Sequence, residues 1–327
     1  NLHSHAFQRA MAGLTEYRGA EPGDNFWTWR QLMYRFLDRL TPDHVQAIAG
    51  FVQMEMLEAG FTSVGEFHYL HHAPGGVPYD SLHELGTRIC AAADQTGIGL
   101  TLLPVLYQTA GCDGRMVGPG QVRFYNDEDR FFVLVEGAQA ALGALPADAG
   151  LGLAPHSLRS VTVPGLRACI DAAQGRPLHM HVAEQAGEVD EVLAHRGARP
   201  VEWLFAHADP DAHWCMIHAT QMLPHETDLL ARSGAVAGLC PITESSLGDG
   251  IFDGVSYQAQ GGRYGIGSDS NIRISLCEEL RTLEYSQRLR DGARAALTRP
   301  PKSNGRTLYD AACAAGAQAL GRGPGAL

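Results

Sequence analysis

Residues 176–184 read RPLHMHVAE, an apolar run that ends in a histidine-containing stretch and leads into a helical pattern at 186–196. Short runs of this kind are typical of buried strands, and they recur along the whole chain. We expect strands at 61–69, 97–107, 150–156, 176–183, 213–220, 234–241 and 263–269. The opening residues 1–5, NLHSH, would be the end of one further strand, which makes eight.

Helical patterns lie between these runs. Thr41-Pro42-Asp43 is expected to begin one helix, with Thr41 as the N-cap and Pro42 at the first helical position. Other helices are expected near 81–96, 128–145, 163–174, 186–196, 200–207, 224–233, 275–291 and 306–320. Two longer stretches, 14–40 and 108–127, are expected to be irregular loops.

Strands that alternate with helices imply a parallel sheet, and eight strand–helix units close into a (β/α)8 barrel. An open, doubly wound sheet is the alternative. Chemically active side chains stand at or just after the carboxyl ends of the expected strands: His5, Tyr69, Tyr107, His156, His181, His218 and Asp269. A barrel would collect them at one mouth, whereas an open sheet would spread them along an edge. Their placement therefore favours an α/β TIM barrel.

The composition excludes several classes of protein. The 327 residues carry a formal charge of −11, which argues against binding to nucleic acid or to anionic membranes. No apolar run approaches the roughly 20 residues that a membrane helix needs. The seven cysteines stand at least 22 residues apart, which excludes Cys-x-x-Cys motifs. We expect buried, reduced thiols in a cytoplasmic protein.

Four residues have the chemistry of a metal site. His3-Ser4-His5 places two imidazoles on the same face of a strand, while His181 and Asp269 end two other expected strands. Taken singly, such residues are more often structural, as packing or helix-capping groups. Their joint position after the first, fifth and eighth strands predicts one site. Three imidazoles and a carboxylate suit Zn²⁺, or alternatively Fe²⁺ or Mn²⁺.

Two further residues lie beside this expected site. His218 ends the sixth strand, and Glu184 follows His181 by three residues. A packing role for His218 and a surface position for Glu184 are the simpler alternatives. Their position next to the metal favours proton transfer, in which Asp269 would also take part.

This constellation resembles the amidohydrolase superfamily, and the resemblance covers essentially the whole chain. It implies a metal-dependent hydrolase whose barrel occupies residues 1–327. Members usually also carry a small β-sandwich, whose segments would precede Asn1 and follow Leu327, so we expect both ends to be missing. Members are often dimers, which makes a homodimer an expectation here.

The single lysine of the chain bears on the number of metals. Binuclear members of the superfamily often use a carboxylated lysine after strand four as a bridge. Lys302 lies far too late for this role, and the segment 154–159, APHSLR, contains neither lysine nor glutamate. The resemblance then implies one metal per subunit, which is typical of deaminases. The metal would lower the pKa of its water towards about 7, Asp269 or His218 would take the proton, and Glu184 would protonate the leaving nitrogen.

Several residues of the expected mouth suit a dianionic, amino-acid-like substrate. Arg159 follows His156 by three residues, and Arg30 lies in the long first loop. Guanidinium groups bind carboxylates in bidentate fashion, although a surface ion pair is the alternative for each arginine. Gln8 and Tyr69 are placed to contact a polar group near the metal.

Within the superfamily, three segments resemble deiminases that release ammonia from N-formimidoyl-L-glutamate in bacterial histidine degradation. They are 3–10 (HSHAFQRA), 26–30 (FWTWR) and 155–159 (PHSLR). The resemblance implies that the substrate is contacted by Gln8, Arg30, Tyr69, His156 and Arg159, with the arginines on its carboxylates. Another mononuclear deaminase, acting on a purine, nucleoside or triazine, is the alternative. A non-catalytic scaffold is a third reading, but it would be expected to have lost metal ligands.

Overall fold

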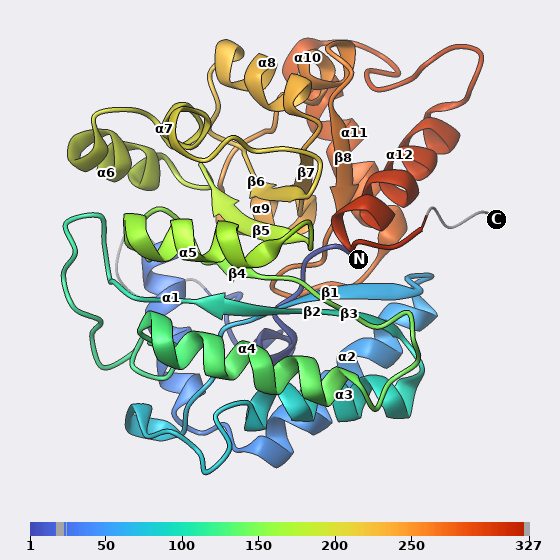
Figure 1. The fold of residues 1–327 in the computed structure, drawn as a ribbon. Coiled ribbons are helices and arrows are strands. Elements are labelled where there is room, and N and C mark those ends of the chain that lie inside the picture. The colour runs from blue at the N-terminus through green and yellow to red at the C-terminus, as the bar shows by residue number, and fades with distance from the viewer. Residues whose placement is uncertain (18–22, 24, 324–327) are drawn as a thin grey trace.

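The structure is a computed structural model that describes residues 1–17, 23 and 25–323. Strands occupy the centre and helices surround them, as the expected barrel requires (Figure 1). The strands are β1 (Ser63–His68), β2 (Gly99–Leu106), β3 (Gly150–Leu151), β4 (Ala154–Pro155), β5 (Leu178–Val182), β6 (Trp214–His218), β7 (Val236–Leu239) and β8 (Arg263–Ile266).

All the strand pairs are parallel and form two four-stranded sheets. The first contains β1 to β4, with both β3 and β4 paired to β2, and the second has the order β5-β6-β7-β8. Isolated bridges join the sheets where Leu153 pairs with Leu178 and Ser157 with His181. The single strand expected at 150–156 is interrupted at Gly152 and Leu153. Both halves pair with β2 on one side, and Leu153 bridges to β5 on the other.

The first residues close the other side of the barrel. Ser4 forms bridges to both Glu66 and Asp269, so the segment lies between β1 and the end of β8. It pairs only through isolated bridges and is not a full strand as expected. Gly65 permits the close approach, because a Cβ there would lie 2.6 Å from the carbonyl oxygen of Leu2.

Helices cover the outside of the barrel. They are η1 (Ala6–Met11), α1 (Phe26–Leu37), α2 (Pro42–Glu58), η2 (Pro74–Gly76), α3 (Glu84–Thr96), α4 (Glu128–Leu142), α5 (Val163–Ala173), α6 (Ala186–Arg196), α7 (Pro200–His207), α8 (Pro224–Ser233), α9 (Pro241–Leu247), α10 (Gly254–Ala259), α11 (Leu276–Asp291) and α12 (Asn304–Ala319). The expected helices are all present, and the expected Thr41 cap accepts a hydrogen bond from the backbone of His44. The short helices η1, η2, α9 and α10 were not expected.

Helix α1 corrects the expectation that 14–40 is a loop, although residues 18–22 and 24 lie outside the described residues. The side chain of Asn25 accepts hydrogen bonds from the N–H groups of Trp27 and Thr28, and so caps the helix. Arg123 anchors its other end, because this buried guanidinium donates to the carbonyls of Leu37 and Leu40. The stretch 108–127 has no helix or strand, as expected.

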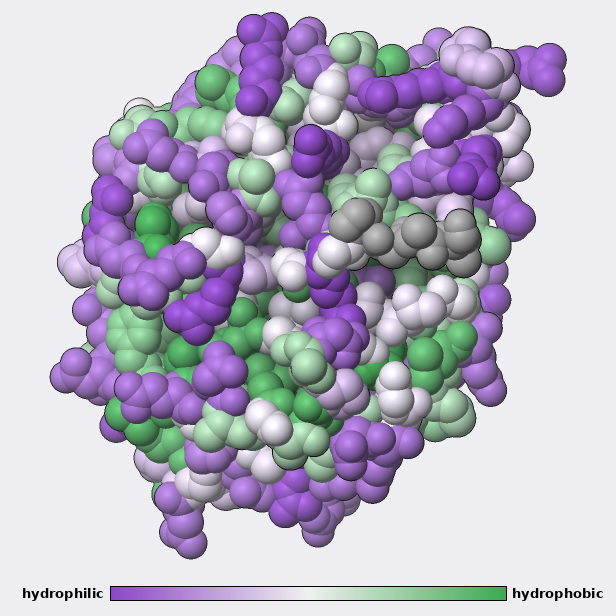
Figure 2. Space-filling view, turned by 45° about the vertical axis from the view of Figure 1, so that its right-hand side comes forward, coloured by the Kyte–Doolittle hydropathy of each residue, from purple (hydrophilic) through white to green (hydrophobic). Residues whose placement is uncertain are grey.

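The structure bears on three points raised by the composition: the polarity of the surface, membrane helices and the burial of the cysteines. Figure 2 shows one face, on which hydrophobic residues gather in the lower half while hydrophilic residues dominate the rim. Among the described residues, no helix is both long and apolar enough to cross a membrane. All seven cysteines are free, but only four are buried as expected, because Cys112 is half-buried and Cys277 and Cys313 are exposed on α11 and α12.

Candidate metal centre and substrate pocket

One pocket collects the side chains that follow the strands. Its lining contains all seven strand-end residues that the sequence placed at the mouth, and it also contains Gln8, Arg30, Arg159 and Glu184. His3 is fully buried beneath it. A second hollow of about 340 Å³ adjoins the pocket, since Gln8, Trp29, Leu247 and Ser270 line both.

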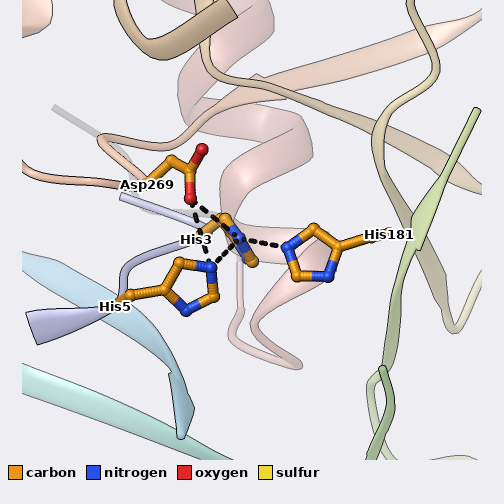
Figure 3. Close-up of side chains that lie close together, drawn as sticks. All are labelled: His3, His5, His181 and Asp269. Atoms are coloured by element: carbon orange, nitrogen blue, oxygen red, sulfur yellow. Dashed lines mark hydrogen bonds and ion pairs between the residues drawn. The ribbon is translucent and has the colours of Figure 1, made fainter. Parts of the chain in front are cut away.

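His3, His5, His181 and Asp269 converge in a buried group that could hold a metal ion (Figure 3). Nε2 of His3 lies 3.2 Å from Nε2 of His5 and 3.1 Å from Nε2 of His181. Oδ1 of Asp269 lies 3.2 Å from Nε2 of His5 and 3.5 Å from Nε2 of His3. Side chains from the opening segment, from β5 and from the turn after β8 therefore meet at one point.

The tautomers of His5 and His181 leave nitrogen lone pairs that can bind a cation. Nδ1 of His5 lies 3.0 Å from the carbonyl oxygen of Phe67, and Nδ1 of His181 lies 3.1 Å from that of His156. Because a carbonyl can only accept, both Nδ1 atoms carry the proton and both Nε2 atoms turn a lone pair into the group. Three nitrogens and a carboxylate then face one another, and a metal ion satisfies them all.

The electrostatics keep these groups in their ligand forms. Burial lowers the pKa of His3 to about 3 and that of His181 well below its usual range, so both imidazoles are neutral. Burial alone would raise the pKa of Asp269, but the neighbouring imidazoles of His3 and His5 outweigh this effect and lower the pKa. Neutral imidazoles and an ionised carboxylate are the forms that bind metals.

Backbone strain concentrates at this mouth. Among the described residues, eight non-glycine residues have a positive φ, and five of them lie at or just after the ends of β5, β6 and β8: Ala183, His218, Ala219, Asp269 and Asn271. Such conformations persist only where the surroundings hold them, and they cluster at functional sites. Asn271 provides part of this support, because its Nδ2 donates to Ser4 Oγ and to the carbonyl of His5.

His218 is buried beside the metal group among three carboxylates. Its Nε2 lies 3.7 Å from Oε1 of Glu184 and 3.8 Å from Oδ2 of Asp269, and its Nδ1 lies 3.2 Å from Oε1 of Glu244. Burial would lower the pKa of His218, but Glu184 and the other carboxylates raise it well above its usual value. Burial also raises the pKa of Glu184 above its usual value.

The sequence reasoning missed Glu244 and Asp249, which stand next to these groups. A carboxylate oxygen of Asp249 lies within 4.8 Å of ligand atoms of both Glu184 and His218. Their position could have indicated them, because both follow the strand expected at 234–241. Residues that follow the carboxyl end of a barrel strand lie at the mouth of the barrel.

Both predicted arginines lack a carboxylate partner among the described residues. Arg159 is 5% exposed, and its Nε has no hydrogen-bond partner in the described chain. Arg30 donates from Nη2 to the hydroxyl of Tyr107 at 2.8 Å. Both guanidinium carbons lie over the indole of Trp27, at 5.7 Å for Arg30 and 5.4 Å for Arg159. Arg159 is buried and Arg30 half-buried, and such cations without a counter-ion indicate a site for an anionic ligand.

The other predicted contacts lie between the metal group and the arginines. Nε2 of Gln8 donates to the hydroxyl of Tyr69 at 2.8 Å, and the ring of Tyr69 packs 4.9 Å from that of His5. The ring of His156 lies 4.9 Å from that of His181 and 4.8 Å from that of Tyr107.

The remaining histidines and the lysine lie elsewhere. His179, which shares the strand face of His181, bonds through Nε2 to the carbonyl oxygen of Ala319 at 2.7 Å. Lys302 is exposed and pairs with Asp310 at 2.7 Å, so it is not part of the pocket. Seven further histidines also fall outside the pocket lining: His71, His72, His83, His195, His207, His213 and His225.

The barrel, the His-x-His segment and the metal group at the strand ends define a metal-dependent hydrolase fold. The chain belongs to the amidohydrolase family, whose model matches residues 1–326. It is 52% identical to formimidoylglutamate deiminase of Pseudomonas aeruginosa over 329 aligned residues, which cover all of this chain and 72% of that protein.

More distant relatives and solved structures extend this picture. The chain is 27% identical to a 5-methylthioadenosine/S-adenosylhomocysteine deaminase of Natronomonas pharaonis, covering 98% of this chain and 67% of the relative. The crystal structure of an amidohydrolase from Brucella melitensis matches with a TM-score of 0.96 and 52% identity, over 98% of this chain and 71% of that one. An adenosine deaminase from Xanthomonas campestris with bound zinc shares the fold at 22% identity and a TM-score of 0.77, over 98% of this chain and 66% of that one.

Proposed function

We propose that this chain hydrolyses N-formimidoyl-L-glutamate to N-formyl-L-glutamate and ammonia. The observation that carries the proposal is the pair of guanidinium groups, Arg30 and Arg159, that line the pocket without carboxylate partners in the described chain. A substrate with two carboxylates would supply the missing negative charge. The 52% identity to a formimidoylglutamate deiminase supports the same substrate.

The metal is proposed to be one Zn²⁺ ion, held by His3, His5, His181 and Asp269. The relative with bound zinc supports this choice, while Fe²⁺ and Mn²⁺ would fit the same donor set. When bound, zinc lowers the pKa of a coordinated water towards about 7 and so supplies a nucleophile near neutral pH.

The charged residues of the pocket would bind the substrate, transfer protons and stabilise developing charge. Arg30 and Arg159 hold the carboxylates and so place the formimino carbon beside the metal group. The ionised Asp269 accepts a proton from the attacking water, while the raised pKa of Glu184 suits it to protonate the nitrogen that leaves as ammonia. His218, whose pKa is raised, can stabilise negative charge that develops on the attacked carbon's substituents.

Ammonia release tests the proposal directly. The metal-replete protein would be incubated with N-formimidoyl-L-glutamate, with N-formimidoyl-L-aspartate, and with adenosine, guanine and a triazine. We expect ammonia release from N-formimidoyl-L-glutamate, loss of this release after chelation, and its recovery when Zn²⁺ is added back. Release from a purine or nucleoside alone would favour the alternative deaminase, and no release from any compound would favour a scaffold.

Reconstitution distinguishes the candidate metals. The chelated protein would be loaded separately with Zn²⁺, Fe²⁺ or Mn²⁺, and the metal content and turnover of each sample would be measured. The highest turnover with Zn²⁺ is expected, and a clear preference for either of the other two ions would contradict that assignment.

A further inference from the structure

The hydroxyl of Tyr107 is buried in the pocket with both of its acceptor positions in use. Tyr107 follows β2 directly and is 1% exposed. Its oxygen accepts a hydrogen bond from Nη2 of Arg30 at 2.8 Å and a second from Nε2 of Gln121 at 2.5 Å. A phenolic oxygen has two lone pairs and one proton, so only its role as a donor remains open.

The direction of the second hydrogen bond is fixed independently. Oε1 of Gln121 accepts from the backbone N–H of Gly118 at 3.1 Å. Because a backbone N–H can only donate, the amide oxygen of Gln121 must face Gly118 and its NH₂ group must face Tyr107. A guanidinium cannot accept a hydrogen bond either, so both partners of Tyr107 donate to it.

The hydroxyl proton therefore lacks an acceptor within the described part of the chain. The ring of Tyr107 is held by its neighbours, with ring centroids 5.6 Å from Phe124 and 4.8 Å from His156. The residue lines the same pocket as Arg30 and Arg159. A buried donor without an acceptor is costly, and a ligand in the pocket can remove that cost.

We propose that Tyr107 is a substrate-binding residue that donates its hydroxyl hydrogen bond to the carboxylate held by Arg30. The two donors are adjacent, so one carboxylate can accept from the guanidinium and from the phenol together. Gln121 positions the phenol, because its hydrogen bond and that of Arg30 occupy both lone pairs of the oxygen. The hydroxyl can then offer the substrate only its proton. This inference rests on the proposed function, because it assumes a ligand with two carboxylates.

Binding to product analogues tests the inference without turnover. The probes are N-formyl-L-glutamate, N-formyl-L-glutamine, in which an amide replaces the side-chain carboxylate, and 4-formamidobutanoate, which lacks the α-carboxylate. Calorimetry would give Kd for each probe with the metal-loaded wild type, with Tyr107→Phe and with Tyr264→Phe. Tyr264 is a matched control, because it is buried, lines a different pocket and has a hydroxyl without a partner in the described chain.

Tyr107→Phe is expected to raise Kd for N-formyl-L-glutamate about 10- to 100-fold, the range for a lost hydrogen bond to a charged group. The loss should largely disappear for the one analogue that lacks the carboxylate bound by Tyr107. Tyr264→Phe should bind all three probes as the wild type does. Thermal unfolding of each variant checks that it is folded.

Two other outcomes separate the claims. If Tyr107→Phe binds like the wild type, or weakens all three probes equally, Tyr107 has no specific carboxylate contact and the inference is wrong. If the wild type does not prefer N-formyl-L-glutamate over the two analogues, the dicarboxylate site itself fails, and the proposed function and this inference are both overturned.

Discussion

Oε1 of Glu244 lies 3.2 Å from Nδ1 of His218, and the same oxygen accepts a hydrogen bond from the N–H of Cys240 at 2.8 Å. The backbone bond holds the carboxylate in place, and the carboxylate holds the imidazole. His218 consequently turns Nε2 towards Glu184 and Asp269. This arrangement would orient His218 for the role proposed above, the stabilisation of negative charge on the substrate.

The variant Glu244→Gln should lose much of this orientation and charge while keeping the side-chain volume. We expect kcat for ammonia release to fall about 100-fold, the low end of the loss when one group that stabilises developing charge is removed. KM should change little, because Glu244 does not line the pocket. Glu136→Gln on the exposed face of α4 is the control. An unchanged kcat would show that His218 does not depend on Glu244.

Removing the charge of Arg159 should weaken substrate binding. In Arg159→Met, KM for N-formimidoyl-L-glutamate should rise about 10- to 100-fold, because a charge-assisted hydrogen bond to a carboxylate is lost. The effect on kcat should be smaller. Steady-state kinetics would compare it with Arg167→Met, an exposed arginine on α5. Equal KM values for the two variants would place the substrate carboxylates elsewhere.

Removing the metal should destabilise the protein, because a metal that binds only the folded state adds to its stability. At a free metal concentration of 1,000 Kd this contribution is about 4 kcal/mol. Thermal unfolding should therefore show a higher Tm with Zn²⁺ than after chelation. The difference should vanish in His181→Ala and persist in His225→Ala, whose histidine is exposed and paired with Glu202. A metal-independent Tm in the wild type would argue against the site.

Asp249 should make stability depend on pH. Burial, together with the charge of Glu184, raises the pKa of Asp249 to about 9, compared with about 3.9 in an unfolded chain. Between these values the unfolded chain loses the proton while the folded one keeps it, so rising pH destabilises the wild type. Relative to the wild type, Asp249→Asn should gain at most about 1.4 kcal/mol per pH unit in this window.

The measurement compares the Tm of wild type and Asp249→Asn between about pH 5 and pH 8, a window inside the two pKa values. The Tm difference should grow in favour of the variant as the pH rises. Asp94→Asn, an exposed position on α3, serves as the control. A difference that stays constant with pH would mean that Asp249 is ionised in the folded protein.

The barrel was accessible from the sequence because each strand is a short apolar run and each helix a periodic one. The strand boundaries were expected about one to three residues too wide, since apolar residues continue past the last ladder hydrogen bond. Helix α1 was missed, although Asn25 and Thr28 form a capping box and Phe26, Trp29 and Met33 follow helical spacing.

The sequence by itself determined which residues gather at the mouth. Parallel strands place their carboxyl ends at one edge, so His181, His218 and Asp269 had to meet wherever the barrel closed. Only the tertiary structure decided how their atoms face one another. The contacts of Glu244 with His218, and of Arg30 and Gln121 with Tyr107, span 26, 77 and 14 residues of chain. Local periodicity records which face of an element is buried, but hydrogen-bond donors and acceptors are matched through space, after the elements have packed.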